Sequence, residues 1–181
     1  FAEEICGQMK ELNFLDSRFE IRISEAEKYS SNGKDEAEFY LSVNPGEPLK
    51  PLGSVASGGE ISRVMLAVKT VLADEEDTPT LIFDEIDVGI SGRTAQMVAE
   101  KMSYIGNTHQ VICISHLAQI AAMADAHYLI EKSSHKDHTS TDIRMLDTEE
   151  SVNELARILG GVEITDSVRE SAAEMKRMAE Q

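Results

Sequence analysis

The chain of 181 residues is long enough to bury one substantial core, and its 41% apolar and 28% charged residues are typical of globular proteins. Its longest uncharged apolar stretches are too short to span a bilayer, so a membrane protein is not expected. The formal net charge of -16 argues against this segment wrapping DNA by itself, because phosphate neutralisation requires clustered Lys and Arg.

The first part of the chain predicts a helix followed by a pair of strands. Apolar residues recur at helical spacing from Phe1 to about Asn13, with charged residues between them. Two alternating runs between Arg18 and Val43 are separated by the polar segment SSNGKD and predict an antiparallel pair. The next segment, NPGEPLKP, is expected to break all regular structure, because proline fixes φ and removes a backbone donor.

A long amphipathic helix is predicted to begin at the segment SGGE, residues 57–60. Its apolar face runs from Ile61 to Leu72. The short apolar run TLIF, residues 80–83, then ends abruptly in the acidic segment DEID. A buried parallel strand ends in this way where it reaches the carboxyl edge of its sheet, so we expect residues 80–83 to form such a strand.

The second half of the chain continues the alternation of helices and strands. Helices are predicted over Arg93–Tyr104 and Leu117–Ala124, and the runs QVICIS and HYLIEK are predicted to be two more buried strands. The predicted fold is therefore α/β, with a mainly parallel sheet flanked by helices, right-handed crossovers and an antiparallel strand pair near the N-terminus.

A hairpin and two helices are predicted to complete the chain. The polar segment SSHKDH separates HYLIEK from TDIRML and is expected to form the hairpin tip, where His135 and His138 fit a solvated turn better than a metal site. The segment VNELARILGG predicts a helix that ends at its glycine pair, and a charged helix is predicted over Asp166–Ala179.

The two cysteines, Cys6 and Cys113, lie far apart and have neither metal-ligand nor disulfide spacing. They are expected to be inert thiols in a reducing compartment, which predicts a cytoplasmic protein. The sequence starts at Phe1 without an initiator Met or a signal peptide, directly in a helical pattern, so we expect it to be cut from a longer protein.

The segment Ser57-Gly58-Gly59-Glu60 has two interpretations. A Ser at the N-cap with a Glu three residues later is a capping box, which any helix can use. Two glycines also expose backbone N–H groups at the positive end of a helix, where a phosphate can approach closely. The two interpretations are compatible, since a capped helix still presents N–H groups outward.

Asp84 and Glu85 follow the predicted strand TLIF directly. Such a carboxylate pair is either the start of a solvated loop or part of a phosphate-transfer site. In the second interpretation Asp84 holds Mg²⁺ directly or through water, and Glu85 orients and deprotonates the attacking water. Adjacent residues at a strand end point in different directions, which allows the two roles to be separate.

His116 follows the predicted strand QVICIS in the same way. A lone histidine at a strand end is more often structural than catalytic. Ligands of open α/β sheets, however, collect outside the carboxyl ends of the strands, so His116, the acidic pair and the SGGE segment are expected to converge on one edge. His109 and His127 flank strands and are assigned no role.

In this order, the sequence has SGGE, an apolar strand with Asp84-Glu85, Asp87 within DVGIS, and ISH ending in His116. The set resembles the signature motif, Walker B motif, D-loop and switch histidine of ATP-binding-cassette ATPases. The signature ends in Glu60 and is preceded by Ala56, whereas the transporter form usually reads LSGGQ, so the resemblance favours the chromosome-maintenance (SMC-like) branch. Longer segments such as LIFDEIDVGISGRTA and ELARILGG look like a bacterial DNA repair member of that branch over nearly the whole chain.

The resemblance implies a role for each of these residues. In the family, the signature motif, here residues 57–60, contacts the γ-phosphate of ATP bound to the opposite head of a dimer. Asp84 would support Mg²⁺, Glu85 would be the general base, Asp87 would help to communicate across the dimer, and His116 would sense the γ-phosphate.

The resemblance also implies that residues 1–16 are the end of a coiled-coil arm and residues 17–181 the C-terminal half of an ATPase head. The phosphate loop G-x-x-x-x-G-K-[ST] is absent from the sequence, where the only Gly-Lys pair precedes Asp35 in a turn. In the family this loop lies in the N-terminal part of the chain. This chain alone is therefore expected not to hydrolyse ATP, because the loop grips the phosphates and supplies a Mg²⁺ ligand.

The leading hypothesis is part of an enzyme that binds and hydrolyses ATP through head dimerisation in DNA double-strand-break repair and recombination. The expected partners are the missing N-terminal half of its own head, a second identical head, double-stranded DNA or DNA ends bound through the whole protein, and the recombination machinery. The expected setting is the nucleoid-associated cytoplasm, without a membrane. Two alternatives stay open, namely a non-catalytic dimerisation module of the same fold and, least favoured, a transporter ATPase subunit.

Overall fold

A computed structural model describes the chain in two compact units, Phe1–Ile114 and Ser115–Gln181. The described residues are 1–54, 57–73, 75, 77–135, 138–161 and 163–179, and the side chains of residues 134–139 lie outside this description. Helices are combined with one parallel and several antiparallel strand pairs, which confirms the predicted α/β class. Within the described residues no helix is both long enough and apolar enough to cross a membrane.

The first unit begins with helix α1, Ala2–Glu11, which contacts helix α2, Gly58–Leu72, and strand β1. Its Ile5 and Met9 are fully buried, so the apolar periodicity of the sequence marks the face that packs. The predicted N-terminal helix is confirmed. The assignment of residues 1–16 to the end of a coiled-coil arm stays a prediction.

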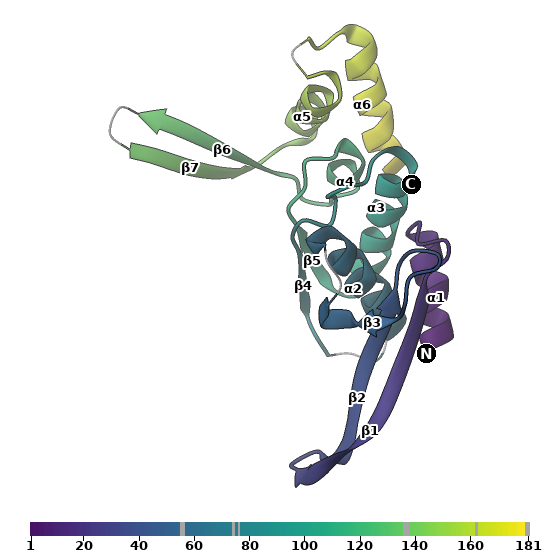
Figure 1. Ribbon diagram of the computed structural model, residues 1–181. Coiled ribbons are helices and arrows are strands. Elements are labelled where there is room, and N and C mark those ends of the chain that lie inside the picture. The colour runs from purple at the N-terminus through teal and green to yellow at the C-terminus, as the bar shows by residue number, and fades with distance from the viewer. Residues whose placement is uncertain (55–56, 74, 76, 136–137, 162, 180–181) are drawn as a thin grey trace. The chain divides into compact units, whose positions relative to one another are not determined.

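Strands β1, Arg18–Ser30, and β2, Gly33–Ser42, form the predicted antiparallel pair as a long hairpin (Figure 1). Phe19 pairs with Leu41, and both side chains are buried, whereas Ile23 further along β1 is 72% exposed. The part of the hairpin that lies near the rest of the unit therefore contributes to the core, and the distal part does not.

The segment after β2 departs from the prediction of a wholly irregular loop. Strand β3, Lys50–Pro51, pairs antiparallel with β2 and leads into a 3-10 turn, η1, Leu52–Ser54. Proline is tolerated in β3 because this strand lies at the edge of its three-stranded sheet, where a missing N–H need not interrupt the ladder.

Strands β4, Thr80–Phe83, and β5, Gln110–Cys113, form the parallel pair, and helix α3, Gly92–Gly106, connects them. Leu81 and Phe83 are buried, but Ile82 is 68% exposed beside its exposed register partner on β5. The expectation that both faces of these apolar strands are buried is therefore wrong for this unit. The described residues cover only one face of the pair.

The second unit contains helices α4, α5 and α6, which pack on Ala118, Ala122, Leu155, Ala156 and Ala172. Their bounds are Ala118–Ala122, Thr148–Gly160 and Asp166–Ala179. All three predicted helices are confirmed, and α5 ends at the predicted glycine pair, where Gly161 has a φ of 64°.

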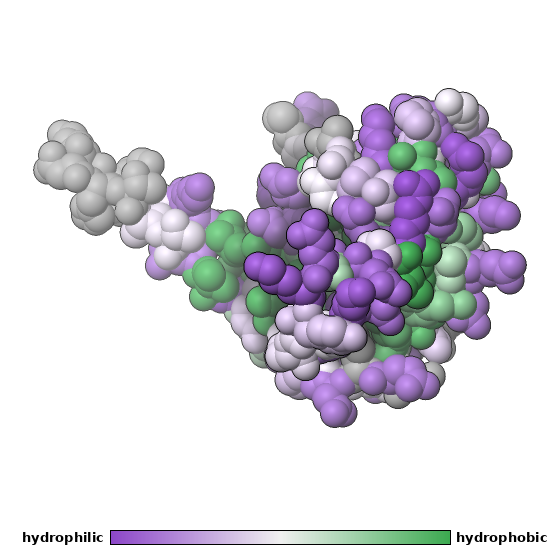
Figure 2. Space-filling view, turned by 60° about the horizontal axis from the view of Figure 1, so that its bottom comes forward, coloured by the Kyte–Doolittle hydropathy of each residue, from purple (hydrophilic) through white to green (hydrophobic). Residues whose placement is uncertain are grey.

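Strands β6, Tyr128–His135, and β7, His138–Met145, form the predicted hairpin of the second unit. In the described residues β6 pairs with β7 in a separate two-stranded sheet, and does not continue the parallel pair. The cross-strand pairs Tyr128–Met145 and Ile130–Ile143 make one face of the hairpin apolar and exposed. In Figure 2 apolar side chains (green) gather near the base of this hairpin, at the left of the view.

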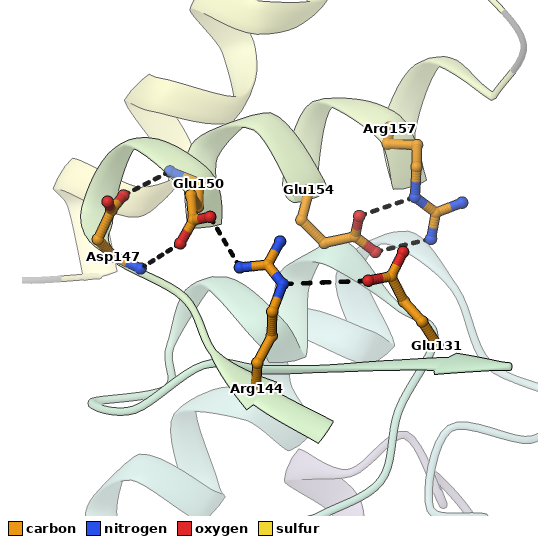
Figure 3. A network of polar contacts seen from close by, with 6 residues as sticks. All are labelled: Glu131, Arg144, Asp147, Glu150, Glu154 and Arg157. Atoms are coloured by element: carbon orange, nitrogen blue, oxygen red, sulfur yellow. Dashed lines mark hydrogen bonds and ion pairs between the residues drawn. The ribbon is translucent and has the colours of Figure 1, made fainter. Parts of the chain in front are cut away.

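The start of α5 is held by a chain of polar contacts (Figure 3). Asp147 Oδ1 accepts a hydrogen bond from Glu150 N–H at 2.8 Å, and Glu150 Oε2 accepts one from Asp147 N–H at 3.1 Å. This reciprocal pair is a complete capping box. Arg144 of β7 donates to Glu150 Oε1 at 2.7 Å, so the same glutamate fixes the path from the hairpin into α5.

Candidate functional site

Helix α2 begins at the predicted SGGE segment with Ser57 as its N-cap. Ser57 Oγ accepts a hydrogen bond from Glu60 N–H at 3.2 Å and donates one to Glu60 Oε2 at 2.8 Å. The predicted cap is present, but the Glu60 carboxylate accepts from the Ser57 hydroxyl, whereas a capping box uses the backbone N–H. Ala56, which precedes the motif, lies outside the described residues.

The two glycines of the motif lie against the loop that follows β4. A Cβ added at Gly59 would lie 2.9 Å from Val88 O and 3.0 Å from Glu85 O, closer than real side chains approach backbone oxygens. A Cβ added at Gly58 would lie 2.5 Å from Glu85 Oε2. Glycine at position 59 is therefore required by backbone packing, and the Glu85 carboxylate lies beside the first turn of α2.

Asp84 and Glu85 lie at the end of β4, where the sequence predicted them, and both side chains are exposed. Asp84 Oδ1 accepts a hydrogen bond from the backbone N–H of Glu85 at 3.0 Å. Glu85 has a left-handed backbone with a φ of 58°. This conformation costs a residue other than glycine about 1–3 kcal/mol, and such strained residues cluster at functional sites.

Arg63 and Ser62, which the sequence reasoning did not single out, connect α2 to the same loop. Arg63 is only 7% exposed, and its Nη1 donates to Ile86 O at 3.2 Å and to Val88 O at 3.0 Å. Ser62 Oγ donates to Asp84 O at 3.0 Å. Arg63 lies four positions after Gly59, a spacing that places both on one face of a helix and was the available signal.

Asp87 is 4% exposed and contributes to the electrostatic environment of Cys113 on β5. Burial raises the pKa of the Cys113 thiol to about 12, and the negative charges of Asp87 and Asp84 add to the shift. Such a thiol stays protonated at neutral pH, in agreement with the expectation of an inert cysteine.

The first unit thus brings the SGGE segment together with the Asp84–Asp87 loop. His116 belongs to the second unit, so its convergence with these residues stays a prediction. The side chains of His135 and His138 lie outside the described part of the chain, and the interpretation of that segment as a solvated turn is not tested.

The chemistry of Asp84 fits one ligand of a Mg²⁺ ion. Among the described residues, no group of three or more His, Cys, Asp and Glu side chains is arranged to hold a metal. Protein Mg²⁺ sites commonly use one or two carboxylates together with substrate phosphates and water. A single exposed carboxylate at a strand end is therefore a sufficient contribution from this loop when a nucleotide supplies further oxygens.

No family model matches the chain, but individual known proteins do. The chain is 47% identical to DNA repair protein RecN of Halalkalibacterium halodurans, with 98% of this chain and 32% of that protein covered. For RecN of Bacillus subtilis the identity is 40%, with 99% and 34% covered. The chain is RecN-like. It spans about a third of the length of these RecN relatives.

The fold of this RecN-like chain also matches part of the fold of SMC heads. It matches the Smc head domain with a coiled coil and joint from Pyrococcus yayanosii with a TM-score of 0.59 at 20% identity, over 85% of this chain and 28% of that chain. It matches the Pyrococcus furiosus Smc head, bound to the C-terminal domain of ScpA, with a TM-score of 0.55 at 19% identity, over 80% and 34%. At these identities the likeness shows the fold, and it confirms the predicted SMC-like head architecture.

Proposed function

We propose that this RecN-like chain is part of an ATPase head that acts in DNA repair. One observation carries the proposal: the capped, glycine-bearing start of α2 packs on the loop that presents Asp84 and Glu85 at the end of a parallel strand. A helix start that accommodates phosphate and a strand end that bears carboxylates are two of the parts that phosphoryl transfer requires. RecN relatives and the SMC-like fold support the assignment.

In the proposed dimer, each SGGE segment completes the nucleotide site of the other head. The backbone N–H groups of Gly58 and Gly59 have no partner within the helix by geometry, and the helix dipole favours an anion there. The Ser57 hydroxyl, which donates to Glu60 Oε2 in the structure, turns to donate to the γ-phosphate. Glu60 keeps its backbone N–H on Ser57 Oγ and so maintains the cap.

Asp84 and Glu85 act in the site of their own head. Asp84 would hold a Mg²⁺ ion directly or through water, and the ion would neutralise charge on the phosphate oxygens. Glu85 orients the attacking water and accepts its proton, a role that requires an exposed carboxylate free to reach a nucleotide. Asp87 communicates between the heads, and His116 senses the γ-phosphate.

The rest of the longer protein completes this head. RecN relatives are about three times as long as this chain, and this chain lacks the phosphate loop. We infer that the loop, the contact with double-stranded DNA or DNA ends and the contact with the recombination machinery come from the remaining length. The acidic net charge of -16 agrees with a DNA site outside this segment.

The test uses the full-length gene product with the substitution Glu85→Gln. We expect turnover to fall by about 10²-fold or more, because the general base is lost, while ATP binding is retained. Glu170→Gln, an exposed residue of α6, is the matched control and should leave turnover unchanged. Unchanged turnover in the Glu85 variant would contradict its role as the base.

A second substitution, Ser57→Arg, separates the enzyme from a non-catalytic dimerisation module. The enzyme hypothesis requires loss of ATP-dependent dimerisation and of turnover with ATP binding retained, because the arginine fills the space of the phosphate from the other head. A module of the same fold would instead show dimerisation but no turnover in the unsubstituted protein. Light scattering with and without ATP, combined with phosphate release, distinguishes these outcomes.

A further inference from the structure

Arg63 is the one arginine among the described residues that is buried, and it lies where α2 meets the Asp84–Asp87 loop. Its guanidinium donates to Ile86 O of that loop at 3.2 Å and to Val88 O, directly after the loop, at 3.0 Å. It also lies over the ring of Phe14, with 5.5 Å between the guanidinium carbon and the ring centroid. One side chain thus joins the helix to the loop.

Burying this charge is unfavourable unless hydrogen bonds compensate. Burial lowers the pKa of Arg63, and the Glu60 carboxylate opposes the shift. A guanidinium nevertheless stays charged in proteins, so its desolvation must be offset by its partners. Its hydrogen-bond acceptors in the described part of the chain are the main-chain carbonyls of Ile86 and Val88, and the guanidinium therefore fixes this backbone in place.

Other contacts make the same junction tight. Ser62 Oγ donates to Asp84 O at 3.0 Å, and the backbone of Gly59 lies too close to Val88 O and Glu85 O to admit a Cβ. The first two turns of α2 and the loop that bears the carboxylates therefore move together. A shift of the helix start displaces the backbone that sets the direction of Glu85.

We propose that Arg63 is a positioning residue that couples the phosphate-binding start of α2 to the Asp84–Asp87 loop of the same head. This inference rests on the proposed function, in which SGGE binds the nucleotide of the other head. Phosphate at that helix start then sets the position of the base and the metal ligand in its own head. Each nucleotide site of the dimer is thereby sensitive to occupation of the other.

The first experiment measures steady-state ATP hydrolysis by the full-length protein with Arg63→Met, Arg63→Lys and the matched control Arg169→Met, an exposed arginine of α6. We expect Arg63→Met to lower kcat by about tenfold or more while KM for ATP stays within about twofold. The reason is that the substitution misplaces the carboxylates but leaves the contacts that bind the phosphates unchanged. Arg63→Lys, which keeps the charge and can still donate to a carbonyl, should recover part of kcat. It also serves as the test if Arg63→Met does not fold.

The second experiment measures amide hydrogen exchange of the same proteins without nucleotide. Val88 N–H and Ile90 N–H bond to Glu85 O at 3.1 Å and Asp87 O at 3.3 Å, and both should exchange about tenfold faster or more when Arg63 no longer holds the loop. A positioning role predicts that the change is confined to this loop. A uniform rise through α1 and α3 would show general destabilisation and would overturn the proposal.

The outcomes separate this inference from the proposed function. An active wild-type protein whose Arg63 variants keep kcat, or keep loop exchange as in Arg169→Met, overturns the coupling and leaves the ATPase assignment intact. A wild-type protein without ATP turnover overturns the proposed function, and the coupling falls with it. Reduced kcat, unchanged KM and loop-confined exchange together support the role of Arg63.

Discussion

Helices α2 and α5 both start with a capping residue followed three positions later by a glutamate, yet the two starts are built differently. In α5, Asp147 and Glu150 bond each other's backbone N–H groups, and Arg144 holds the glutamate (Figure 3). In α2, the Ser57 hydroxyl bonds the Glu60 carboxylate, and glycines occupy the first two helical positions.

The difference lies in what each helix start presents to an approaching anion. The start of α5 has the Asp147 cap and acidic residues at positions 149 and 150, whose charges repel phosphate. The start of α2 has the Glu60 carboxylate in its first turn and the Glu85 carboxylate beside it, but its first two helical residues have no side chains. The same spacing forms a complete capping box in α5, whereas in α2 it is combined with two glycines, which under the proposed function allow a phosphate to approach the helix N–H groups.

The largest expected effect is that of Gly59→Ala, which compares a helix glycine packed against backbone with one that has open space around it. The added Cβ meets Val88 O at 2.9 Å, so we expect the free energy of unfolding to fall by about 1–3 kcal/mol. Gly7→Ala in α1 is the matched control, because nothing lies within 4 Å of its added Cβ, and it should stabilise by about 0.5–1 kcal/mol. Urea unfolding of both variants measures the contrast, and equal shifts would contradict it.

Removal of each cap should separate stability from function. Asp147→Ala and Ser57→Ala are each expected to lower the free energy of unfolding by about 1 kcal/mol, because each leaves an N–H of the first turn without its acceptor. Only Ser57→Ala should also weaken ATP-dependent dimerisation of the full-length protein. If Asp147→Ala weakened dimerisation equally, the functional distinction between the two helix starts would be lost.

The ion pairs of Arg144 should contribute less than either cap. Arg144 lies 2.7 Å from Glu150 and 4.0 Å from Glu131, and its side chain is half exposed. Arg144→Met is therefore expected to cost below about 1 kcal/mol at low salt. Thermal unfolding at low and at molar salt measures the screening of this contribution, and a loss that is independent of salt would indicate packing of the side chain instead.

The smallest expected effect is a pH dependence at the start of α5. Burial lowers the pKa of His127, the Glu154 charge opposes the shift, and the Lys176 charge adds to it. Since the unfolded chain binds the proton more readily, stability is full above the ordinary pKa of 6.5 and falls as the pH drops through the lowered pKa of the folded state. Unfolding at pH 7 and pH 5 should show a smaller decrease for His127→Gln than for the wild type.

Helices and hairpins could be predicted because their periodicity lies within one segment. The predicted helix over Asp166–Ala179 has the observed bounds, and the hairpin of β1 and β2 lies where alternation and a turn segment placed it. The exposure of Ile82 could not be predicted in this way. An apolar strand pattern indicates that both faces favour burial, but does not show whether the same chain provides the cover.

The candidate site was only partly accessible from sequence. Spacing and residue type pointed to Ser57 and to the acidic pair, because caps and strand ends have local signatures. The approach of Gly59 to Val88 and the bonds of Arg63 depend on tertiary packing between segments that are distant in sequence. From the sequence alone, Arg63 fits the polar face of an amphipathic helix, and only its tertiary contacts indicate another role.

At Glu85, the left-handed backbone conformation lowers stability at a position that the proposed function needs for catalysis. Glycine or asparagine adopts this conformation more readily, so selection of the protein for heat resistance alone is expected to favour Glu85→Gly or Glu85→Asn. Under the proposed function, the variants that survive heating best would be those that no longer turn over nucleotide. Recovery of such variants from a library would mark Glu85 as a residue retained at the expense of stability.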